Sequence, residues 1–387
     1  MGPNWFQFAL LTLMTLLVGM TIGVERVVLP PLAHRAFGVT SLELTVSFVS
    51  AFGAVKATLN MFAGHWSDRL GRRGLMAAGW ALGVPYPLLI AFAPSWGWVV
   101  VANLFLGANQ GLAWTTSVTA KIDLVGPVRR GLAVGIDEAA GYVGTAVGGY
   151  AAGLIATSAG LRPDPYWLAL GIIVLGGMLT LWPVRDTLPW AAAEAAQRPA
   201  RKAGENQAPR PSLARLMGYM SWRDRAMFAA CQGGTVNKFA DALVIGMFPL
   251  WLVGHHVSVA TVGLITGVYA AVWGFLQIPS GQAADRLGRK WLIAGGLIAE
   301  GVAVAWFVTG HGLATWLGAA IVMGIGTAAL YPNLITAVSD ISHPAWRGGS
   351  LGVYRLWRDG GYAIGPLITA GFATGFGLAA GFWFVAA

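Results

Sequence analysis

Eleven apolar segments, most of them close to 20 residues or longer, recur along this chain of 387 residues. A run of about 20 apolar residues is what an α-helix needs to cross the hydrocarbon core of a bilayer. Because a chain in lipid must satisfy its own backbone hydrogen bonds, such runs predict helices. They cover approximately residues 5–31, 43–64, 74–93, 97–119, 131–157, 166–184, 226–253, 258–280, 291–309, 313–338 and 348–373. The sequence therefore predicts an all-α, multi-pass membrane protein.

The charge of the chain indicates its orientation. The net charge of +9 raises the possibility of nucleic-acid binding, but only 11% of the residues are charged, against about 25% in soluble domains. Most Lys and Arg residues fall in segments assigned to the cytoplasm, so the basicity follows the positive-inside rule. The first apolar run has no basic segment before it, which indicates a membrane helix and not a cleaved signal. We expect a cytoplasmic N-terminus, the inner membrane of a bacterium and no nucleic-acid partner.

One polar loop occurs twice, as GHWSDRLGRR from Gly64 and as GQAADRLGRK from Gly281. Its aspartates, Asp68 and Asp285, are 217 residues apart, and the same offset relates Gly144 to Gly361. Such a repeat predicts two similar halves. We predict domains at 1–185 and 226–387, joined by a basic cytoplasmic linker at 186–225 with room for one surface helix. The offset leaves only half a spanning helix for the twelfth segment, so we expect a tail beyond residue 387 or an incomplete helix.

The repeated loop resembles the G-x-x-x-D-R-x-G-R-R motif of the major facilitator superfamily, although a plain basic loop is the simpler alternative. The resemblance implies two pseudo-symmetric six-helix bundles, twelve helices in all, around a central cavity. It also implies that the two loops help to close the cytoplasmic side. The gate residues carried over in this way are Gly64, Asp68, Arg69, Gly71, Arg72, Arg73, Asp285, Arg286 and Arg289.

Two glycine series resemble the superfamily's antiporter motif, G-x8-G-x3-G-P-x2-G-G. The first contains Gly135, Gly144 and Gly148, and the second repeats it at 352, 361 and 365. The resemblance implies exchange of a substrate for protons, whereas general helix packing is the alternative. Drug-exporting members usually carry an arginine in the fourth helix, where this chain has Asn103. Asparagine cannot supply the positive charge with which that arginine would alter the pKa of a carboxyl group.

Charged residues inside the apolar segments are functional candidates, because charge in lipid must face a cavity or a partner. With nearby polar and aromatic residues, the predicted cavity contains Glu25, Arg26, Lys56, Asn109, Gln110, Trp114, Asp137, Glu138, Tyr142, Lys238, Asp241, Tyr331, Arg355, Arg358 and Asp359. Structural ion pairs are the alternative for each, and the preferred one for Glu300. The five cations and five acids balance, so they give no sign for the substrate charge.

The chain lacks the motifs of an enzyme or an ATPase. Its histidines have no metal-ligand spacing, and there is no phosphate-binding loop. We predict a monomeric secondary transporter without metal or cofactor, which exports a small organic compound in exchange for protons. One or more of the acids Glu25, Asp137, Glu138, Asp241 and Asp359 would bind the proton. One alternative is a proton-coupled importer or facilitator of an organic anion that uses Lys56, Arg355 and Arg358, and another is a non-transporting receptor.

Overall fold

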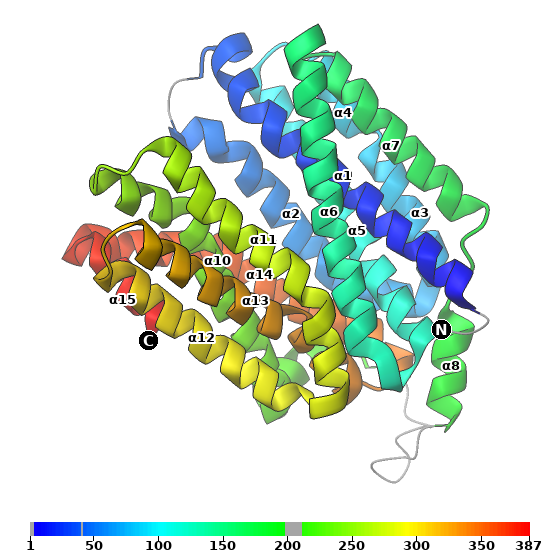
Figure 1. The fold of residues 1–387 in the computed structure, drawn as a ribbon. Coiled ribbons are helices and arrows are strands. Elements are labelled where there is room, and N and C mark those ends of the chain that lie inside the picture. Colours follow the sequence, from blue (N-terminus) through cyan, green and yellow to red (C-terminus); the bar gives the residue numbers. More distant parts are fainter. Residues whose placement is uncertain (1–3, 40–41, 198–210) are drawn as a thin grey trace. The chain divides into compact units, whose positions relative to one another are not determined.

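The computed structural model describes residues 4–39, 42–197 and 211–387, and the regular elements within these ranges are all helices (Figure 1). By length and composition, eight of the helical segments described are apolar enough to cross a membrane. They include Trp5–Phe37 at the start and Leu313–Ile341 near the end. The predicted all-α membrane architecture is confirmed.

The first half contains the six predicted spans. They are α1 (Trp5–Phe37), α2 (Leu42–Leu70), α3 (Arg72–Gly83) with α4 (Pro85–Ala91), α5 (Trp96–Val125), α6 (Arg130–Ala159) and α7 (Asp164–Leu181). The third span is divided at Pro85, since proline cannot donate the backbone hydrogen bond of a helix interior. Helix α5 runs to Val125, beyond the predicted end of this span at residue 119, so Lys121 and Asp123 are helical.

The second half contains α10 (Arg225–Gly254), α11 (Val259–Leu287), α12 (Arg289–Thr309), α13 (Leu313–Ile341), α14 (Arg347–Phe376) and the short α15 (Leu378–Ala386). The predicted linker holds α8 (Leu188–Gln197), α9 (Leu213–Gly218) and a π-helical turn, η4 (Tyr219–Arg223). Its residues 198–210 lie outside the described ranges. With α8, α9 and η4, the predicted linker contains more regular structure than the one surface helix that the sequence predicts.

The chain forms two compact units that do not follow the chain order. The first unit comprises Met1–Pro127, Asp137–Met217 and Ser342–Val353, and the second comprises Val128–Ile136, Gly218–Ile341 and Tyr354–Ala387. The first turns of α6 thus belong with the second unit, and the first turns of α14 belong with the first. A division of the chain at 185 and 226 remains a prediction.

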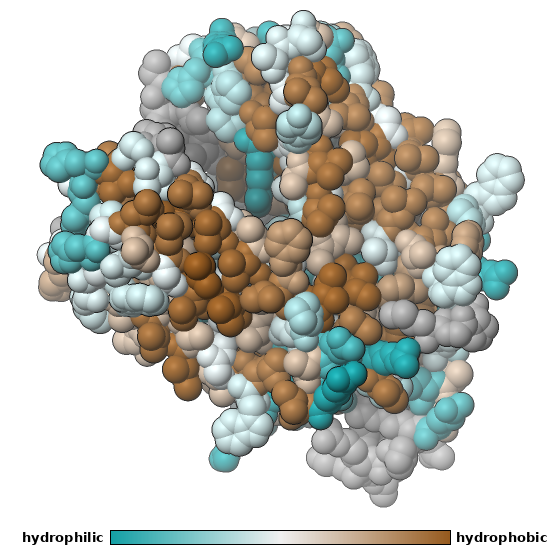
Figure 2. Space-filling view, viewed as in Figure 1, coloured by the Kyte–Doolittle hydropathy of each residue, from teal (hydrophilic) through white to brown (hydrophobic). Residues whose placement is uncertain are grey.

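The repeated glycines let helices approach at backbone distance. In the first unit, a side chain at Gly144 of α6 would collide with the carbonyl group of Leu16 in α1. In the second unit, a Cβ atom at Gly361 of α14 would lie 2.6 Å from the carbonyl oxygen of Thr235 in α10. Large apolar side chains such as Trp182 and Phe275 are exposed, and apolar residues cover much of the visible face (Figure 2). These surfaces suit contact with lipid.

Candidate functional site

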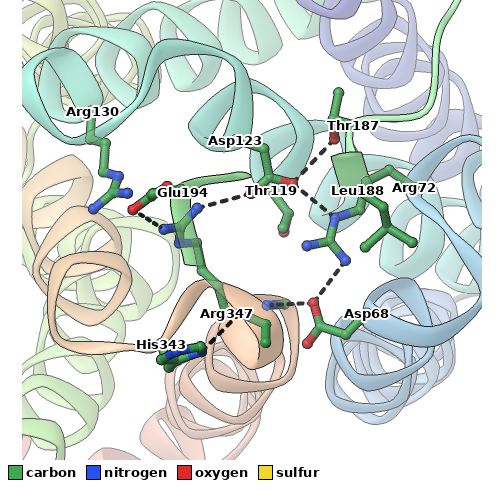
Figure 3. A network of polar contacts seen from close by, with 12 residues as sticks. Asp68, Arg72, Thr119, Asp123, Arg130, Thr187, Leu188, Glu194, His343 and Arg347 are labelled. Atoms are coloured by element: carbon green, nitrogen blue, oxygen red, sulfur yellow. Dashed lines mark hydrogen bonds and ion pairs between the residues drawn. The ribbon is translucent and has the colours of Figure 1, made fainter. Parts of the chain in front are cut away.

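Asp68 was predicted in a loop but lies in the last turn of α2, where it binds the start of α14 within the first unit (Figure 3). Its Oδ1 atom accepts hydrogen bonds from Arg72 Nη1 at 2.7 Å and from the Gly348 amide at 3.1 Å. Its Oδ2 atom accepts from the Gly349 amide at 2.7 Å. The first amides of a helix lack intrahelical partners and carry partial positive charge. Asp68 therefore caps α14 while it is also ion-paired with Arg72.

Asp123 of α5 joins this cap to a second arginine (Figure 3). It accepts from Arg72 Nε at 3.1 Å and from Arg347 Nη1 at 2.9 Å, and Arg347 Nη2 also donates to Glu194 of α8 at 2.7 Å. The side chains of Arg72, Asp123 and Arg347 are almost completely buried. We did not predict Asp123, Arg347 or Glu194 as site residues, although the offset relates Arg347 to Arg130.

The second unit repeats the cap with the equivalent residues. Asp285 accepts hydrogen bonds from the amides of Gly131 and Leu132 at the start of α6, both at 2.9 Å. Arg289 Nη2 donates to Asp285 Oδ1 at 2.8 Å. Each of these residues lies 217 positions from its counterpart in the first unit. Asp68 and Asp285, in the last turns of α2 and α11, therefore have the same local role: each caps a helix whose residues are divided between the two units.

The second network is the more exposed of the two. Asp340, the counterpart of Asp123, binds Arg289 Nε and Arg130 Nη1, both at 3.0 Å. The Asp340 side chain is 35% exposed, whereas that of Asp123 is 0% exposed. Water therefore screens the second network more strongly.

The other predicted gate residues have different roles in the geometry. A side chain at Gly64 would collide with the Gly348 carbonyl group, and Gly71 has a φ of +93° that disfavours any side chain. The Arg73 guanidinium group donates to the carbonyl oxygens of Thr180 and Leu181 in α7. Arg69 and Arg286 are exposed.

Four predicted cavity residues come together inside the first unit. The indole nitrogen of Trp114 on α5 donates to Glu138 Oε1 on α6 at 3.4 Å. Tyr142, one turn along α6, contacts the same indole with ring centroids 6.4 Å apart. The Lys56 ammonium group on α2 lies 5.3 Å from the Trp114 ring centroid. Glu138 is 0% exposed. A carboxyl group, a cation and two aromatic rings from three helices thus share one place.

Asp137, beside Glu138 in sequence, takes part in a different contact. It forms a buried ion pair with Lys121 of α5 and accepts a hydrogen bond of 2.6 Å from Thr15 of α1. Lys121 also donates to Thr15 at 3.0 Å. Lys121 lies beyond the predicted end of this span at residue 119, so the sequence did not indicate it as the partner of Asp137. Asp137 thus has a buried ion-pair partner, and its predicted place in the cavity stays a prediction.

The remaining predicted residues of the first unit are placed separately. Asn109 and Gln110 donate to the carbonyl oxygens of Gly79 and Val18 on neighbouring helices, at 3.0 and 2.8 Å. Glu25 is buried, and among the described residues its Oε1 atom has no hydrogen-bond partner. Arg26 is exposed.

In the second unit, two cations lie against one aromatic ring. The Lys238 ammonium group is 5.4 Å from the centroid of Tyr331, and the Arg358 guanidinium carbon is 4.2 Å from it. Lys238 is paired with Asp241 at 2.7 Å, and Arg358 with Asp359 at 3.0 Å. Tyr331 is the counterpart of Trp114 by the 217-residue offset, so both units place cations on an aromatic ring at equivalent positions.

Two features complete the local geometry. Arg355 on α14 is buried. Within the described ranges, no group of three or more His, Cys, Asp or Glu residues is arranged to hold a metal ion.

Comparisons with known sequences identify relatives along the whole chain. The profile of the Major Facilitator Superfamily matches residues 11–237 and 230–387. The multidrug resistance protein MdtG of Proteus mirabilis is 25% identical over 358 residues, which span 90% of this chain and 82% of that protein. The quinolone resistance protein NorA of Staphylococcus aureus is 26% identical over 124 residues, 32% of each chain.

Solved structures share the fold at low sequence identity. The human organic anion transporter MFSD10 superposes with a TM-score of 0.81 at 16% identity, and covers 100% of this chain and 97% of its own. The transporter FucP gives a TM-score of 0.78 at 14% identity, with 98% and 95% covered. With the profile matching both halves, these relatives are transporters and not enzymes. The chain therefore belongs to the Major Facilitator Superfamily and is a multi-pass membrane transporter.

Proposed function

We propose that this transporter exports a small organic compound in exchange for protons, and that Glu138 binds the proton. The observation that carries the proposal is the complete burial of Glu138 beside Trp114, whose ring also contacts the Lys56 ammonium group. An intramembrane carboxyl group in such surroundings is a functional candidate.

The neighbouring cation supplies a physical basis for proton loading and release. Burial without a cation favours the neutral form of a carboxyl group, and a nearby cation favours the ionised form. Lys56 and Glu138 lie on different helices and both contact Trp114. A conformational change that alters their separation would therefore change the proton affinity of Glu138.

The names of the relatives support efflux of an organic compound. MdtG is named for multidrug resistance and NorA for quinolone resistance. We extend this property to the present chain as part of the proposal, together with a monomeric state and an N-terminus on the cytoplasmic side.

Reconstituted vesicles with an imposed pH gradient test the proposal, with norfloxacin, a quinolone, as the transported probe. The wild type is expected to move norfloxacin against the proton flow. Glu138→Gln is expected to lose about tenfold or more of the gradient-driven rate, as is usual when a proton-transfer group is removed. Asp164→Asn, at the start of α7, is the control for loss of a carboxyl group.

The outcomes separate two kinds of failure. If Glu138→Gln keeps the pH dependence of the wild type, the proton binds elsewhere. If the gradient has no effect on the wild type with norfloxacin or a wider set of organic cations and anions, proton exchange itself is refuted.

A second candidate function is proton-coupled import or facilitated passage of an organic anion. The observation that favours it is the placement of Lys238 and Arg358 on the Tyr331 ring, together with the predicted cations Lys56 and Arg355. Carboxyfluorescein, an organic anion, is a suitable probe for this alternative. Inward accumulation that requires an acidic exterior, and that Arg358→Gln abolishes, would favour import over export.

A further inference from the structure

A continuous row of oxygen atoms links two buried carboxyl groups in the second unit. Thr327 Oγ1 on α13 lies 2.6 Å from Glu300 Oε1 on α12, and 3.3 Å from Tyr269 Oη on α11. Tyr269 Oη lies 3.1 Å from Asp241 Oδ1 on α10. All four side chains are buried, with Glu300 only 3% exposed. Four helices therefore contribute one polar path between Glu300 and Asp241.

Counting the protons on this path shows that one is missing if both carboxyl groups are ionised. Three oxygen–oxygen contacts require three protons to be hydrogen bonds. The hydroxyl groups of Thr327 and Tyr269 supply one proton each, and an ionised carboxylate supplies none. The path is complete only when one carboxyl group is in its acid form. We propose that Glu300 and Asp241 share one proton, which moves between them through the two hydroxyl groups.

The surroundings place the proton on Glu300 in this structure. Asp241 forms an ion pair with Lys238 at 2.7 Å, which stabilises its ionised form. The donors to Glu300 Oε1 are neutral: the Thr327 hydroxyl group and the Asn237 amide at 2.7 Å. Glu300 Oε2 is buried without a hydrogen-bond partner among the described residues. An ionised Glu300 would leave charge on an unsolvated oxygen, which is costly.

The groups that face the path decide which end holds the proton. Lys238 and Arg358 lie on the Asp241 side, where both contact the Tyr331 ring. The α15 segment, which also packs against α12, contains no titratable side chain. If Lys238 leaves Asp241, for example to bind an anionic group, the stabilisation of the ionised Asp241 is lost. The proton then moves toward Asp241.

The transfer is balanced without another reactant. The Glu300 O–H bond breaks as a bond forms at Thr327 Oγ1, the Thr327 proton passes to Tyr269 Oη, and the Tyr269 proton passes to Asp241 Oδ1. Each hydroxyl group ends with one proton, and the net change is one proton moved from Glu300 to Asp241. The role of this transfer in transport rests on the proposed proton exchange. The Glu300–Asp241 pair would then be a second proton-binding site in addition to Glu138.

Infrared spectroscopy of the purified full-length protein in vesicles tests the shared proton without any substrate. The wild type is expected to show a carboxylic-acid carbonyl band at neutral pH that Glu300→Gln removes. The glutamine side chain can still accept a hydrogen bond from Asn237 and contact Thr327. We therefore expect this variant to fold. A wild type without the band, or a band unchanged in Glu300→Gln and Asp241→Asn, would overturn the proposal.

The path itself is tested by hydrogen–deuterium exchange of that acid proton. We expect Tyr269→Phe and Thr327→Val to slow the exchange of the acid proton for deuterium, followed by the shift of the carbonyl band, by about tenfold or more. Each variant removes one hydroxyl group of the path. Tyr354→Phe and Thr336→Val are matched controls: the Tyr354 hydroxyl group has no hydrogen-bond partner among the described residues, and Thr336 bonds within its own helix. Equal exchange rates in relay and control variants would refute the path.

Transport measurements then separate this inference from the proposed function. If the wild type couples norfloxacin to the pH gradient but Tyr269→Phe couples it equally well, the relay is not part of the cycle and the inference fails alone. If the wild type shows no coupling while the band and its exchange behave as expected, the shared proton stands and the proposed export mechanism fails.

Discussion

Replacement of Asp68 by asparagine tests how strongly the Asp68 side chain binds the start of α14. The asparagine side chain keeps one oxygen that can accept hydrogen bonds, but it carries no charge. Its NH2 group takes the place of the other carboxylate oxygen, which accepts a hydrogen bond in the wild type. Two backbone amides and Arg72 then share a single neutral acceptor. Because the helix α14 spans both units, a weaker cap changes the stability of the state in which this contact is made.

The structure sets the size of the effect. The Asp68 and Arg72 side chains are 4% and 1% exposed, so water screens their ion pair little. Breaking a buried pair by removal of one partner costs about 3–5 kcal/mol. At the lower value, the capped state loses population relative to the uncapped state by about 150-fold, since about 1.4 kcal/mol is a factor of ten. We therefore expect Asp68→Asn to reduce transport by about one to two orders of magnitude.

The assay is norfloxacin flux into vesicles, normalised to the amount of folded protein by size-exclusion chromatography. Asp224→Asn is the matched control, because Asp224 caps α10 in the same way but is more accessible to water, and asparagine caps helices well. Transport by Asp68→Asn that equals the wild type at normal expression would refute the reasoning. A loss of expression in proportion to transport would instead indicate a purely folding role.

Three further predictions follow from the same contacts. Asp285→Asn is expected to reduce transport less than Asp68→Asn, by about tenfold, because its network is more exposed to water; an equal or larger loss would contradict this order. Gly144→Ala is expected to lower the melting temperature by several degrees, since its Cβ would collide with the Leu16 carbonyl group, whereas Gly171→Ala faces open space and serves as the control. Lys121→Met and Asp137→Asn are each expected to destabilise the protein by about 3 kcal/mol, and the double variant by less than their sum, in a denaturation-based double-mutant cycle; additive effects would show that the ion pair contributes nothing.

The helices were predictable because lipid imposes a strict rule on the sequence. Every spanning segment must be apolar over about 20 residues, so the runs ending near Leu181 and Thr309 are visible without a structure. The ends of the helices were less predictable. Lys121 lies just beyond the predicted end of the span at residue 119, yet the structure keeps it inside α5, where it pairs with Asp137. A charged residue ends an apolar run in the sequence, but the helix can continue past it when the charge is paired.

The grouping of the polar residues was only partly accessible. Lys56, Trp114 and Glu138 were all candidates, but the sequence could not show that Trp114 contacts both charges. A structural ion pair is the interpretation that the sequence favours for Glu300. Its hydrogen-bond path to Asp241 depends on Tyr269 and Thr327, two residues that no motif distinguishes. Such a path requires side-chain positions from four helices.

The 217-residue offset explains the similarity of the two networks around Asp68 and Asp285 but not the way their partners are exchanged. It relates Asp123 to Asp340 and Arg130 to Arg347, yet each arginine binds the aspartate of the opposite sequence half. A repeat in sequence shows which residues are equivalent but not that they exchange partners. The exchange arises because the first turns of α6 and α14 belong to the unit opposite to the rest of their helices. Glu194 of the linker helix α8 then adds a second acceptor to Arg347. The network around Asp68 is therefore less exposed to water and includes the further ion pair of Arg347 with Glu194. This difference is the physical reason to expect a larger loss of transport in Asp68→Asn than in Asp285→Asn.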